Sequence, residues 1–212
     1  MYEFEREELV KTLIKKGVRD KNVLNAILKV ERHLFIPRSL WKDAYQDTAI
    51  PIGYEQTISQ PYTVAVMTEA LKVDKGNKIL EIGTGSGYQA AILVQMGAQV
   101  YSIERNYQLY LLVRERMDKI GIHAALKYGD GTIGWNEFAP FDGIVVTAGS
   151  PEIPKTLLKQ LKIGGRLVIP VGNKLEQDLI ILEKKNEDTF KKEVLPHFAF
   201  VKLIGREGWR DR

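Results

Sequence analysis

The sequence predicts an α/β fold: a doubly wound, mostly parallel sheet, preceded by N-terminal helices and followed by a C-terminal antiparallel hairpin. Three observations support this prediction. From residue 78 onward, apolar runs of strand length alternate with segments whose apolar side chains have helical spacing. The first of these runs ends in a Gly-rich turn that leads into a helical segment. Beyond residue 171 a polar turn replaces the helical segment, which indicates a hairpin.

The alternating region defines the expected sheet. Its strands are expected at residues 78–82, 99–103, 124–128, 142–147 and 165–171. Its helices are expected at residues 86–96, 107–120 and 153–161. Parallel strands need a crossover connection, usually a helix, so this alternation predicts helices on both faces of the sheet. The closing hairpin is expected from strands at 177–184 and 190–203.

The N-terminal part has a different pattern. Residues 4–16 and 20–30 have helical apolar spacing, with Asp20 expected as the N-cap of the second helix. Arg32 to Pro37 is expected to be extended, because the residue before a proline avoids the helical region. Residues 45–60 show little periodicity but are rich in polar residues. Pro61 suits the first turn of a helix that runs to about residue 73.

Composition narrows the class of protein. The 212 residues are 44% hydrophobic and 27% charged, which is ordinary for a globular domain with a full core. Cysteine is absent, so disulfides and thiolate metal sites are excluded and a reducing compartment is favoured. Residues 1–10 carry four glutamates and no apolar run, unlike a secretory signal, and no stretch approaches the roughly 20 apolar residues of a membrane span. We expect a cytoplasmic protein without a membrane partner.

The distribution of basic residues bears on possible partners. The net charge is +4 with a pI near 9.1, and the lysines and arginines are spread along the chain. A nucleic-acid-binding protein would more often show clustered Lys and Arg with interleaved aromatics, so we expect no nucleic-acid partner. The pairs Lys184-Lys185 and Lys191-Lys192 flank a polar turn and are interpreted as a solvated hairpin tip. The three histidines lack metal-ligand spacing, and no metal site is expected.

The Gly-rich turn after the first strand, residues 83–87, is a candidate nucleotide site. Glycines let a ligand approach the backbone closely, and the following helix N-terminus offers free N–H groups. On its own such a turn is weak support, since a plain structural turn has the same composition. Tyr88 stands where a dinucleotide-binding turn needs a third small residue, which disfavours a dinucleotide.

Two acidic residues strengthen the nucleotide interpretation. Glu104 ends the second strand, where a carboxylate can accept both ribose hydroxyls of a nucleoside; the alternative is a surface ion pair with Arg105. Gly129-Asp130-Gly131 follows the third strand, where Asp130 could accept a hydrogen bond from the exocyclic amine of adenine. The alternative for Asp130 is ordinary Asp-Gly turn chemistry.

With these elements the sequence resembles the class I S-adenosylmethionine-dependent methyltransferases, which have a Rossmann-like fold, over roughly residues 76–171. The resemblance implies that Glu81 lies near the methionine ammonium group. It also implies that the Gly-rich turn carries the amino-acid part of S-adenosyl-L-methionine, the methyl donor, with S-adenosyl-L-homocysteine as product.

A second, more specific resemblance covers almost the whole chain. Residues 45–61 (YQDTAIPIGYEQTISQP), taken with Arg32-x-x-Phe35-Ile36-Pro37, closely resemble the protein-L-isoaspartate (D-aspartate) O-methyltransferases. The match continues through residues 80–91, 102–105, 145–148, 160–172 and 200–205. It implies methyl transfer to the α-carboxylate of L-isoaspartyl residues in damaged proteins and peptides, which initiates their repair; D-aspartyl residues stay open as substrates.

The resemblance divides one methyltransferase domain, residues 1–212, into three regions. Residues 1–75 are the N-terminal helical and substrate-loop region, residues 76–171 the cofactor-binding core and residues 172–212 the C-terminal strands. Two departures from the family pattern stand out in this sequence. The run Thr147-Ala148-Gly149-Ser150-Pro151 differs from a commoner all-Ala version, and Lys202 replaces a frequent proline, which bears on the shape of the C-terminal substrate strand.

The family's site residues carry over by motif. The serine of the Thr-Ile-Ser triplet, Ser59, is the expected catalytic residue; the alternative role for Ser59 is an N-cap of the helix beginning at Pro61. The expected cofactor-binding residues are Gln56, Thr57, Ile58, Ser59, Glu81, Gly83, Thr84, Gly85, Ser86, Gly87, Glu104, Arg105, Gly129, Asp130 and Thr147.

The chemistry asks little of these residues. A carboxylate nucleophile with a pKa of about 3.5–4 is already ionised at neutral pH, so no general base is needed. Catalysis then rests on positioning and water exclusion.

A methyltransferase of the same fold acting on nucleic acid or a small molecule would predict an Asn/Asp-Pro-Pro-aromatic motif where this chain has residues 147–151. A non-catalytic adaptor would predict decay of the Gly-rich turn or of the Ser59 motif. Trp209 is expected either to close over the substrate or to pack on the sheet.

Overall fold

A computed structural model describes residues 2–210. The helices are α1 (Glu3–Lys15), α2 (Lys21–Lys29), α3 (Pro61–Leu71), α4 (Tyr88–Gln95), α5 (Tyr107–Lys119) and α6 (Lys155–Gln160). The strands are β1 (Ile50–Gly53), β2 (Gln56–Ile58), β3 (Lys78–Ile82), β4 (Gln99–Glu104), β5 (Ala125–Tyr128), β6 (Phe141–Val146), β7 (Leu161–Gly172), β8 (Gln177–Lys184) and β9 (Phe190–Phe198). Short 3-10 helices are η1 (Arg32–Phe35), η2 (Arg38–Asp43), η3 (Gly131–Ile133) and η4 (Asn136–Phe138).

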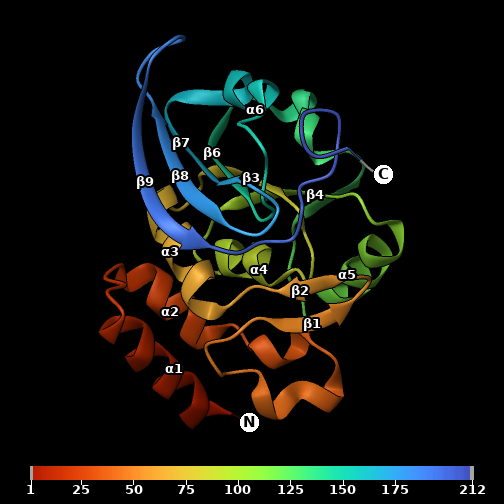
Figure 1. The fold of residues 1–212 in the computed structure, drawn as a ribbon. Coiled ribbons are helices and arrows are strands. Elements are labelled where there is room, and N and C mark those ends of the chain that lie inside the picture. The colour runs from red at the N-terminus through yellow and green to blue at the C-terminus, as the bar shows by residue number, and fades with distance from the viewer. Residues whose placement is uncertain (1, 211–212) are drawn as a thin grey trace.

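The main sheet has seven strands in the order β5-β4-β3-β6-β7-β8-β9 (Figure 1). The first five strands are parallel, while β8 and β9 add an antiparallel edge, as the sequence predicts. The order of strands along the chain reverses between β3 and β6. At such a switch point the connections leave toward opposite faces of the sheet, which opens a crevice at the carboxyl ends of the strands.

The hydrophobic core lies on both faces of the sheet, because the central strands carry apolar side chains on both sides. In β3 the side chains of Ile79, Leu80 and Ile82 are buried, as expected for a parallel strand covered on both sides. Helices α3, α4 and α5 cover one face of the sheet, and α6 lies on the other. Figure 1 shows α1 and α2 below α4, so the N-terminal helices pack on this helical layer.

The entry to α2 follows its local sequence. Asp20 is the N-cap, and its carboxylate accepts hydrogen bonds from the backbone N–H groups of Asn22 and Val23. This confirms the predicted cap, which satisfies two of the helix's otherwise unpaired donors. No helix within residues 2–210 is long and apolar enough to cross a membrane.

The segment after α2 is a correction to the sequence analysis. Residues Arg32–Phe35 form the 3-10 helix η1 and are not extended; only Ile36, directly before Pro37, has the extended backbone that a following proline requires. In a 3-10 helix residues i and i+3 lie on the same side. The turn therefore brings Arg32 and Phe35 to one face, where both are buried.

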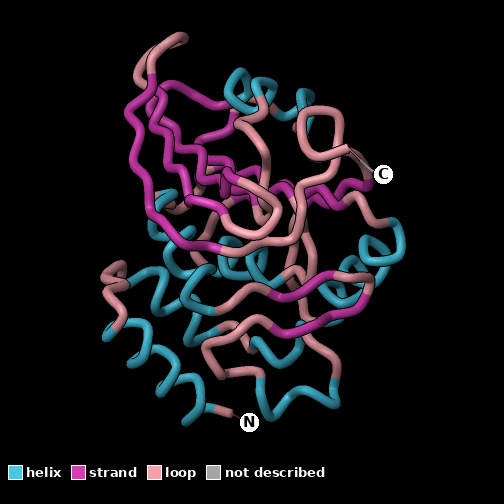
Figure 2. Tube along the Cα trace, viewed as in Figure 1, coloured by secondary structure: helices cyan, strands magenta, loops and turns pink. Residues whose placement is uncertain are grey.

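Residues 45–60 contain a hairpin that their weak periodicity did not predict. Strands β1 and β2 pair antiparallel, with Ile50 opposite Ile58, and form a separate two-stranded sheet visible at the centre of Figure 2. Tyr54 and Glu55 at its tip both have left-handed backbone angles, with φ of 53° and 56°. Non-glycine residues rarely adopt this conformation, and two in succession match the tight turn that twisted hairpins need.

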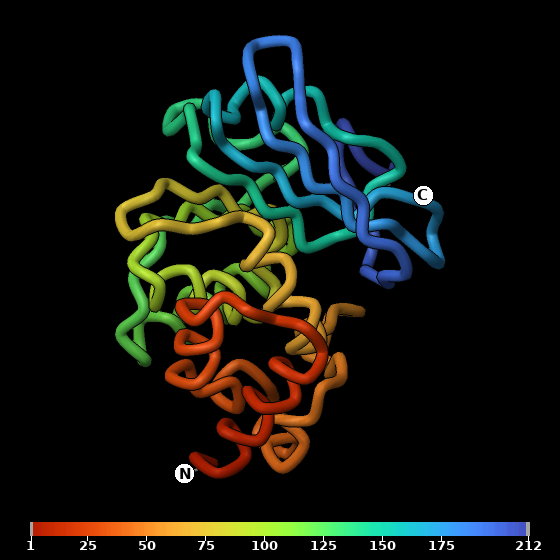
Figure 3. Tube along the Cα trace, turned by 90° about the vertical axis from the view of Figure 1, so that its left-hand side faces the viewer, coloured from red at the N-terminus to blue at the C-terminus, as the bar shows by residue number. Residues whose placement is uncertain are grey.

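The C-terminal part differs from prediction at two places. Strand β9 ends at Phe198 instead of residue 203, and residues 201–203 cross to Gly149 instead. The β8–β9 hairpin extends beyond the rest of the sheet (Figure 3). Its tip is not uniformly solvated, because Lys184 is buried and its Nζ donates to the carbonyl of Leu161 at 3.0 Å.

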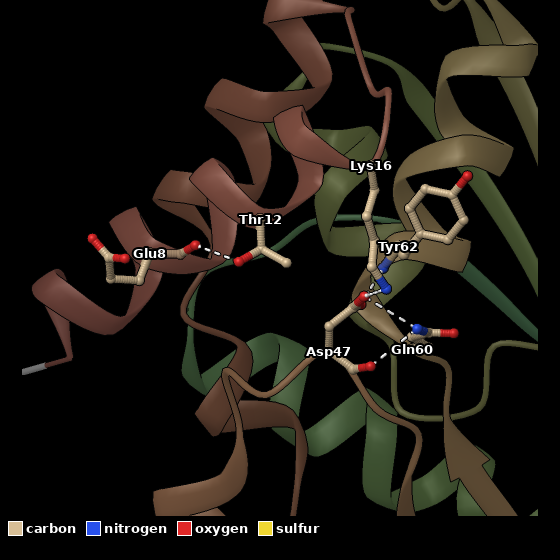
Figure 4. A network of polar contacts seen from close by, with 6 residues as sticks. All are labelled: Glu8, Thr12, Lys16, Asp47, Gln60 and Tyr62. Atoms are coloured by element: carbon tan, nitrogen blue, oxygen red, sulfur yellow. Dashed lines mark hydrogen bonds and ion pairs between the residues drawn. The ribbon is translucent and has the colours of Figure 1, made fainter.

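The N-terminus of α3 is capped from a distant loop. Its N-cap residue, Gln60, makes no side-chain capping bond; instead Asp47 Oδ1 accepts a hydrogen bond from the Tyr62 N–H at 2.8 Å. Figure 4 shows Lys16 and Gln60 converging on the same carboxylate, with Lys16 Nζ 2.5 Å from Oδ2. The interpretation of Ser59 as the helix cap is therefore wrong.

We expect Asp47→Ala to lower the free energy of unfolding by about 1–2 kcal/mol, the cost of losing a helix cap together with its hydrogen bonds. Urea denaturation checks this. Lys16→Ala is the matched control: it removes only the half-exposed ion-pair partner and should cost less than about 1 kcal/mol. Equal stability of Asp47→Ala and the unaltered chain would show that Asp47 does not hold α3.

Candidate active site

A cavity of about 280 Å³ lies at the carboxyl ends of β3, β4 and β6, at the switch point of the sheet. Such crevices are where open α/β sheets bind ligands. Its lining includes the β1–β2 hairpin, the Gly-rich turn after β3, the ends of β4 and β6, residues of α3 and α4, and the C-terminal segment 201–204.

Most of the predicted cofactor residues come together in this lining. They are Gln56, Thr57, Ile58, Ser59, Glu81, Gly83, Thr84, Gly85, Ser86, Glu104, Arg105 and Thr147. Gly87, Gly129 and Asp130 lie outside it: Gly129 and Asp130 border a neighbouring depression with Arg105 and Ile204.

The glycines of the turn serve two different purposes. Gly85 has a φ of 55°, a Cβ there would meet only the Gly83 carbonyl oxygen at 4.0 Å, and the residue lines the cavity, so its backbone is accessible to a ligand. Gly87, the N-cap of α4, faces inward: a Cβ would lie 2.6 Å from a methyl group of Val113. Gly87 therefore allows α4 to pack closely on α5.

Glu104 is a structural anchor as well as a candidate ligand. Its side chain is 6% exposed, so Glu104 is not a surface residue. Oε2 accepts from the Gly85 N–H at 2.9 Å, and Oε1 accepts from the Asn106 N–H at 2.8 Å. Each carboxylate oxygen can accept a further hydrogen bond, so these contacts fix the carboxylate and leave it able to bind hydroxyl donors.

Glu81 is fully buried beneath the turn. Ser102 Oγ donates to its Oε2, and Thr84 Oγ1 lies 2.6 Å from Ser102 Oγ. Among the described residues, Oε1 has no hydrogen-bond partner. Burial, with a smaller contribution from the charge of Glu104, raises the pKa of Glu81 to about 8. An unpaired, buried carboxylate oxygen in a cavity wall fits a cationic ligand group, because a positive charge would stabilise its ionised form.

Thr147 ties the end of β6 to the turn. Its Oγ1 donates toward the carbonyl of Gly83 at 2.6 Å, and a Cβ on Gly83 would approach this oxygen to 2.5 Å. Only glycine at position 83 leaves room for this contact. The short side chain and hydroxyl of Thr147 thus shape the floor of the cavity.

Asp130 uses both carboxylate oxygens within the protein. Oδ1 accepts from the Thr132 N–H and hydroxyl at 2.9 and 2.7 Å, and Oδ2 accepts from the Arg206 N–H at 2.8 Å. These bonds cap η3 and attach the C-terminal turn to the end of β5. Turn chemistry accounts for this geometry, and a contact of Asp130 with adenine stays a prediction.

Ser59 follows β2 and lines the cavity. Within residues 2–210 its hydroxyl has no hydrogen-bond partner, while its carbonyl oxygen accepts from Arg32 Nη2 at 2.8 Å. The main chain at Ser59 is therefore held in place, while no other described residue hydrogen-bonds to its hydroxyl.

Several cavity residues had no assigned role in the sequence analysis. Tyr54 and Glu55 form the hairpin tip, and Tyr88 and Gln89 begin α4. Residues Val201–Ile204 were matched to the family only as sequence. Of these, the sequence singles out only Tyr88, because a bulky residue after the third glycine disfavours a dinucleotide.

The C-terminal segment forms one wall of the cavity by pairing with Gly149. The Gly149 N–H donates to the Val201 carbonyl at 2.7 Å, and the Leu203 N–H donates to the Gly149 carbonyl at 2.8 Å. The N–H of Lys202 is not used in this pairing, so lysine in place of proline does not disturb it. Trp209 Nε1 donates to the same Gly149 carbonyl at 3.0 Å, so Trp209 packs behind the wall and is not part of the lining.

The family of this chain follows from comparison with known proteins. The family model for protein-L-isoaspartate(D-aspartate) O-methyltransferase matches residues 4–208. The chain belongs to this family. It is 50% identical to the protein-L-isoaspartate O-methyltransferase of Pelodictyon phaeoclathratiforme over 212 residues, covering 100% of this chain and 96% of the relative.

Solved structures of the family agree in fold. A protein-L-isoaspartate O-methyltransferase superposes with a TM-score of 0.85 at 32% identity, covering 96% of this chain and 67% of the other. A Plasmodium falciparum structure, described as a member of this family in complex with S-adenosyl-L-homocysteine, has a TM-score of 0.81 at 26% identity and covers 94% and 98% of the two chains. The family uses S-adenosylmethionine, and the cavity meets one requirement of that cationic donor, the unpaired carboxylate oxygen of Glu81.

The pKa of Glu81 makes stability depend on pH. With a folded-state pKa of about 8 and an ordinary value of 4.5, the folded chain keeps a proton that the unfolded chain has lost between these values. The free energy of unfolding should therefore fall as pH rises from about 4.5 to about 8, and this part of the dependence should vanish in Glu81→Gln. Urea unfolding of both proteins across that range, without added cofactor, checks it. Identical slopes would show that Glu81 ionises normally.

Proposed function

We propose that this chain transfers a methyl group from S-adenosylmethionine to the α-carboxylate of L-isoaspartyl residues in damaged proteins, with Ser59 orienting that carboxylate. One observation supports this role above others. Ser59 lines the cavity, its side chain does not cap α3, and Arg32 binds its main-chain carbonyl.

Different residues of the chain bind different parts of the methyl donor. The buried carboxylate of Glu81 stabilises the ammonium group of its methionine part, and the carboxylate of Glu104 accepts hydrogen bonds from the ribose hydroxyls. The accessible backbone of Gly85 lies between them. When bound, the cofactor supplies an electrophilic sulfonium methyl group.

The acceptor needs orientation but no deprotonation. An α-carboxylate is ionised at neutral pH, so the protein's task is to align one oxygen with the methyl group. The Ser59 hydroxyl donates a hydrogen bond to the other oxygen. The hairpin tip and residues 201–204 enclose this position and limit the access of water.

Recognition of isoaspartate rests on geometry. In an isoaspartyl unit the main chain runs through the side-chain methylene, which leaves the α-carboxylate on a shorter arm beside the backbone. Normal aspartate carries a carboxylate of similar basicity on a longer arm. A site that holds the substrate main chain between the hairpin and Lys202 admits only the shorter arm to the reacting position.

A nucleic-acid or small-molecule substrate is less compatible with this site. A base-stacking motif would have to follow β6, but both hydrogen-bonding groups of Gly149 are occupied by residues 201–203 and Trp209. The chain's own C-terminal segment therefore fills the space beside this loop.

We expect Ser59→Ala to lower turnover on an isoaspartyl peptide at least tenfold while changing affinity for S-adenosylhomocysteine less than about twofold, because a substrate-orienting hydrogen bond acts in the transition state. Steady-state kinetics and calorimetric titration measure the two quantities. Glu104→Ala is the opposite control and should weaken product affinity by about 1.5–3 kcal/mol, as for hydrogen bonds to a charged group. Normal turnover by Ser59→Ala would remove Ser59 from the reaction.

Two peptides that differ only in Asp or isoAsp at one position test the substrate class. Misplacement of the reacting group by about 1 Å can cost roughly a hundredfold in rate, so methyl transfer from labelled cofactor should be at least that much faster to isoAsp. Equal rates on the two peptides, or transfer only to a nucleic acid or small metabolite, would overturn the proposed substrate.

A further inference from the structure

Arg32 is a buried charge without an acidic partner. Its side chain is 0% exposed, and no carboxylate among residues 2–210 lies within ion-pair distance of it. Its guanidinium instead donates to three carbonyl oxygens: Nε to Ala44 at 2.9 Å, Nη2 to Ser59 at 2.8 Å and, more weakly, Nη2 to Thr48 at 3.4 Å. Burial lowers the pKa of Arg32 only to about 10, so it is charged at neutral pH.

Such an arrangement is a poor way to gain stability. Taking a charge out of water costs several kcal/mol, and a well-packed apolar side chain of similar size would often stabilise the fold more. The three acceptors share a location, however: all lie in residues 44–59, the segment that carries the β1–β2 hairpin and ends at Ser59.

The guanidinium also contacts Tyr88, a residue that lines the cavity. It lies over the ring of Tyr88, with its central carbon 4.9 Å from the ring centroid. Tyr88 is the first residue of α4, directly after the Gly-rich turn, and it lines the cavity. Phe35 meets the same ring edge-on at 5.5 Å, so the 3-10 helix η1 presents two of its buried side chains, Arg32 and Phe35, to Tyr88.

We propose that Arg32 is a positioning residue for methyl transfer: stacked on Tyr88, it holds the Ser59 main chain at a fixed distance from the turn that binds the methyl donor. This inference rests on the proposed role of Ser59. It assigns a catalytic purpose to the Arg32-x-x-Phe35 motif, whose residues do not themselves line the cavity.

The geometry explains why arginine is required. Two separate carbonyls are bound from different nitrogens of one plane, and the same group lies over an aromatic ring. A lysine ammonium is a compact point charge that can neither bridge the carbonyls in this way nor stack. Arg32→Lys keeps the charge and loses the bridge.

The test is the rate of a single turnover with S-adenosylmethionine already bound and isoaspartyl peptide at saturation. Arg32→Lys should slow it about 10- to 100-fold, since a shift of about 1 Å at Ser59 has that effect. Its affinity for S-adenosylhomocysteine should change less than about twofold. Arg6→Lys, a mostly buried arginine that pairs with Glu31 in the same region, is the matched control and should keep the normal rate.

A double-mutant cycle with Ser59→Ala separates positioning from mere folding. If Arg32 acts through Ser59, the double variant should turn over within about twofold of Ser59→Ala alone, because the group being positioned is gone. Multiplied effects of the two changes, or a loss of S-adenosylhomocysteine affinity as large as the loss of rate, would overturn the inference.

The remaining outcomes are also decisive. If Arg32→Lys does not fold, Tyr88→Leu replaces it in the cycle at saturating cofactor: it removes the stacking surface, and its effect should likewise disappear in the Ser59→Ala background. Should Ser59→Ala alone turn over normally, the proposed function of Ser59 fails and this inference with it. If Ser59→Ala turns over slowly and the rate losses of the two variants multiply in the double variant, only the role of Arg32 is overturned.

Discussion

Strand β3 pairs in parallel with β4 on one side and β6 on the other, and this double pairing determines where the site can be. Parallel strands end at the same edge of the sheet, so the Gly-rich turn, Glu104 and Thr147 meet there although they are far apart in the sequence. The same pairing buries Glu81 between two strands, with Ser102 of β4 as its hydrogen-bond partner. Burial at this position raises the pKa of Glu81, and a nearby cation would favour its ionised form.

The β1–β2 hairpin, which lines one side of the cavity, is connected to this sheet only indirectly. The β1–β2 hairpin forms its own small sheet, and the N-terminal helices pack on α3 and α4. Among the polar contacts that fix this layer, two lie near the cavity: Asp47 binds the start of α3, and Arg32 joins the Ser59 carbonyl to the ring of Tyr88. Apolar packing alone, which tolerates sliding, would leave the distance between the hairpin and the Gly-rich turn loosely defined.

The sequence predicts the sheet well because fully buried parallel strands are continuous apolar runs bounded by glycines, and β3 and β8 match their expected bounds. It fails where structure depends on distant partners. Strands of three or four residues such as β1 and β2 carry too little periodicity to stand out, and η1 is stabilised by the burial of Arg32 and Phe35 against Tyr88. Of the site, the position of Glu104 at the end of a strand predicted it in the cavity wall, while Glu81 was expected there from the family resemblance. It could not show that the Gly87 position packs on α5 or that Asp130 binds the C-terminal turn.

Ser59 illustrates how a local capping rule is overridden by a contact from a distant loop. A serine two residues before a helix-starting proline is well placed to satisfy the helix's free N–H groups, and capping would hold its hydroxyl against the backbone. Here Asp47, twelve positions earlier in a loop, caps the helix instead. Its carboxylate binds the Tyr62 N–H, Gln60 and Lys16. The stronger charged cap stabilises α3, and the serine next to it keeps a hydroxyl that no backbone group competes for. For the role proposed for Ser59, an unpaired hydroxyl on a fixed main chain suits a carboxylate acceptor, because binding the acceptor breaks no hydrogen bond within the protein.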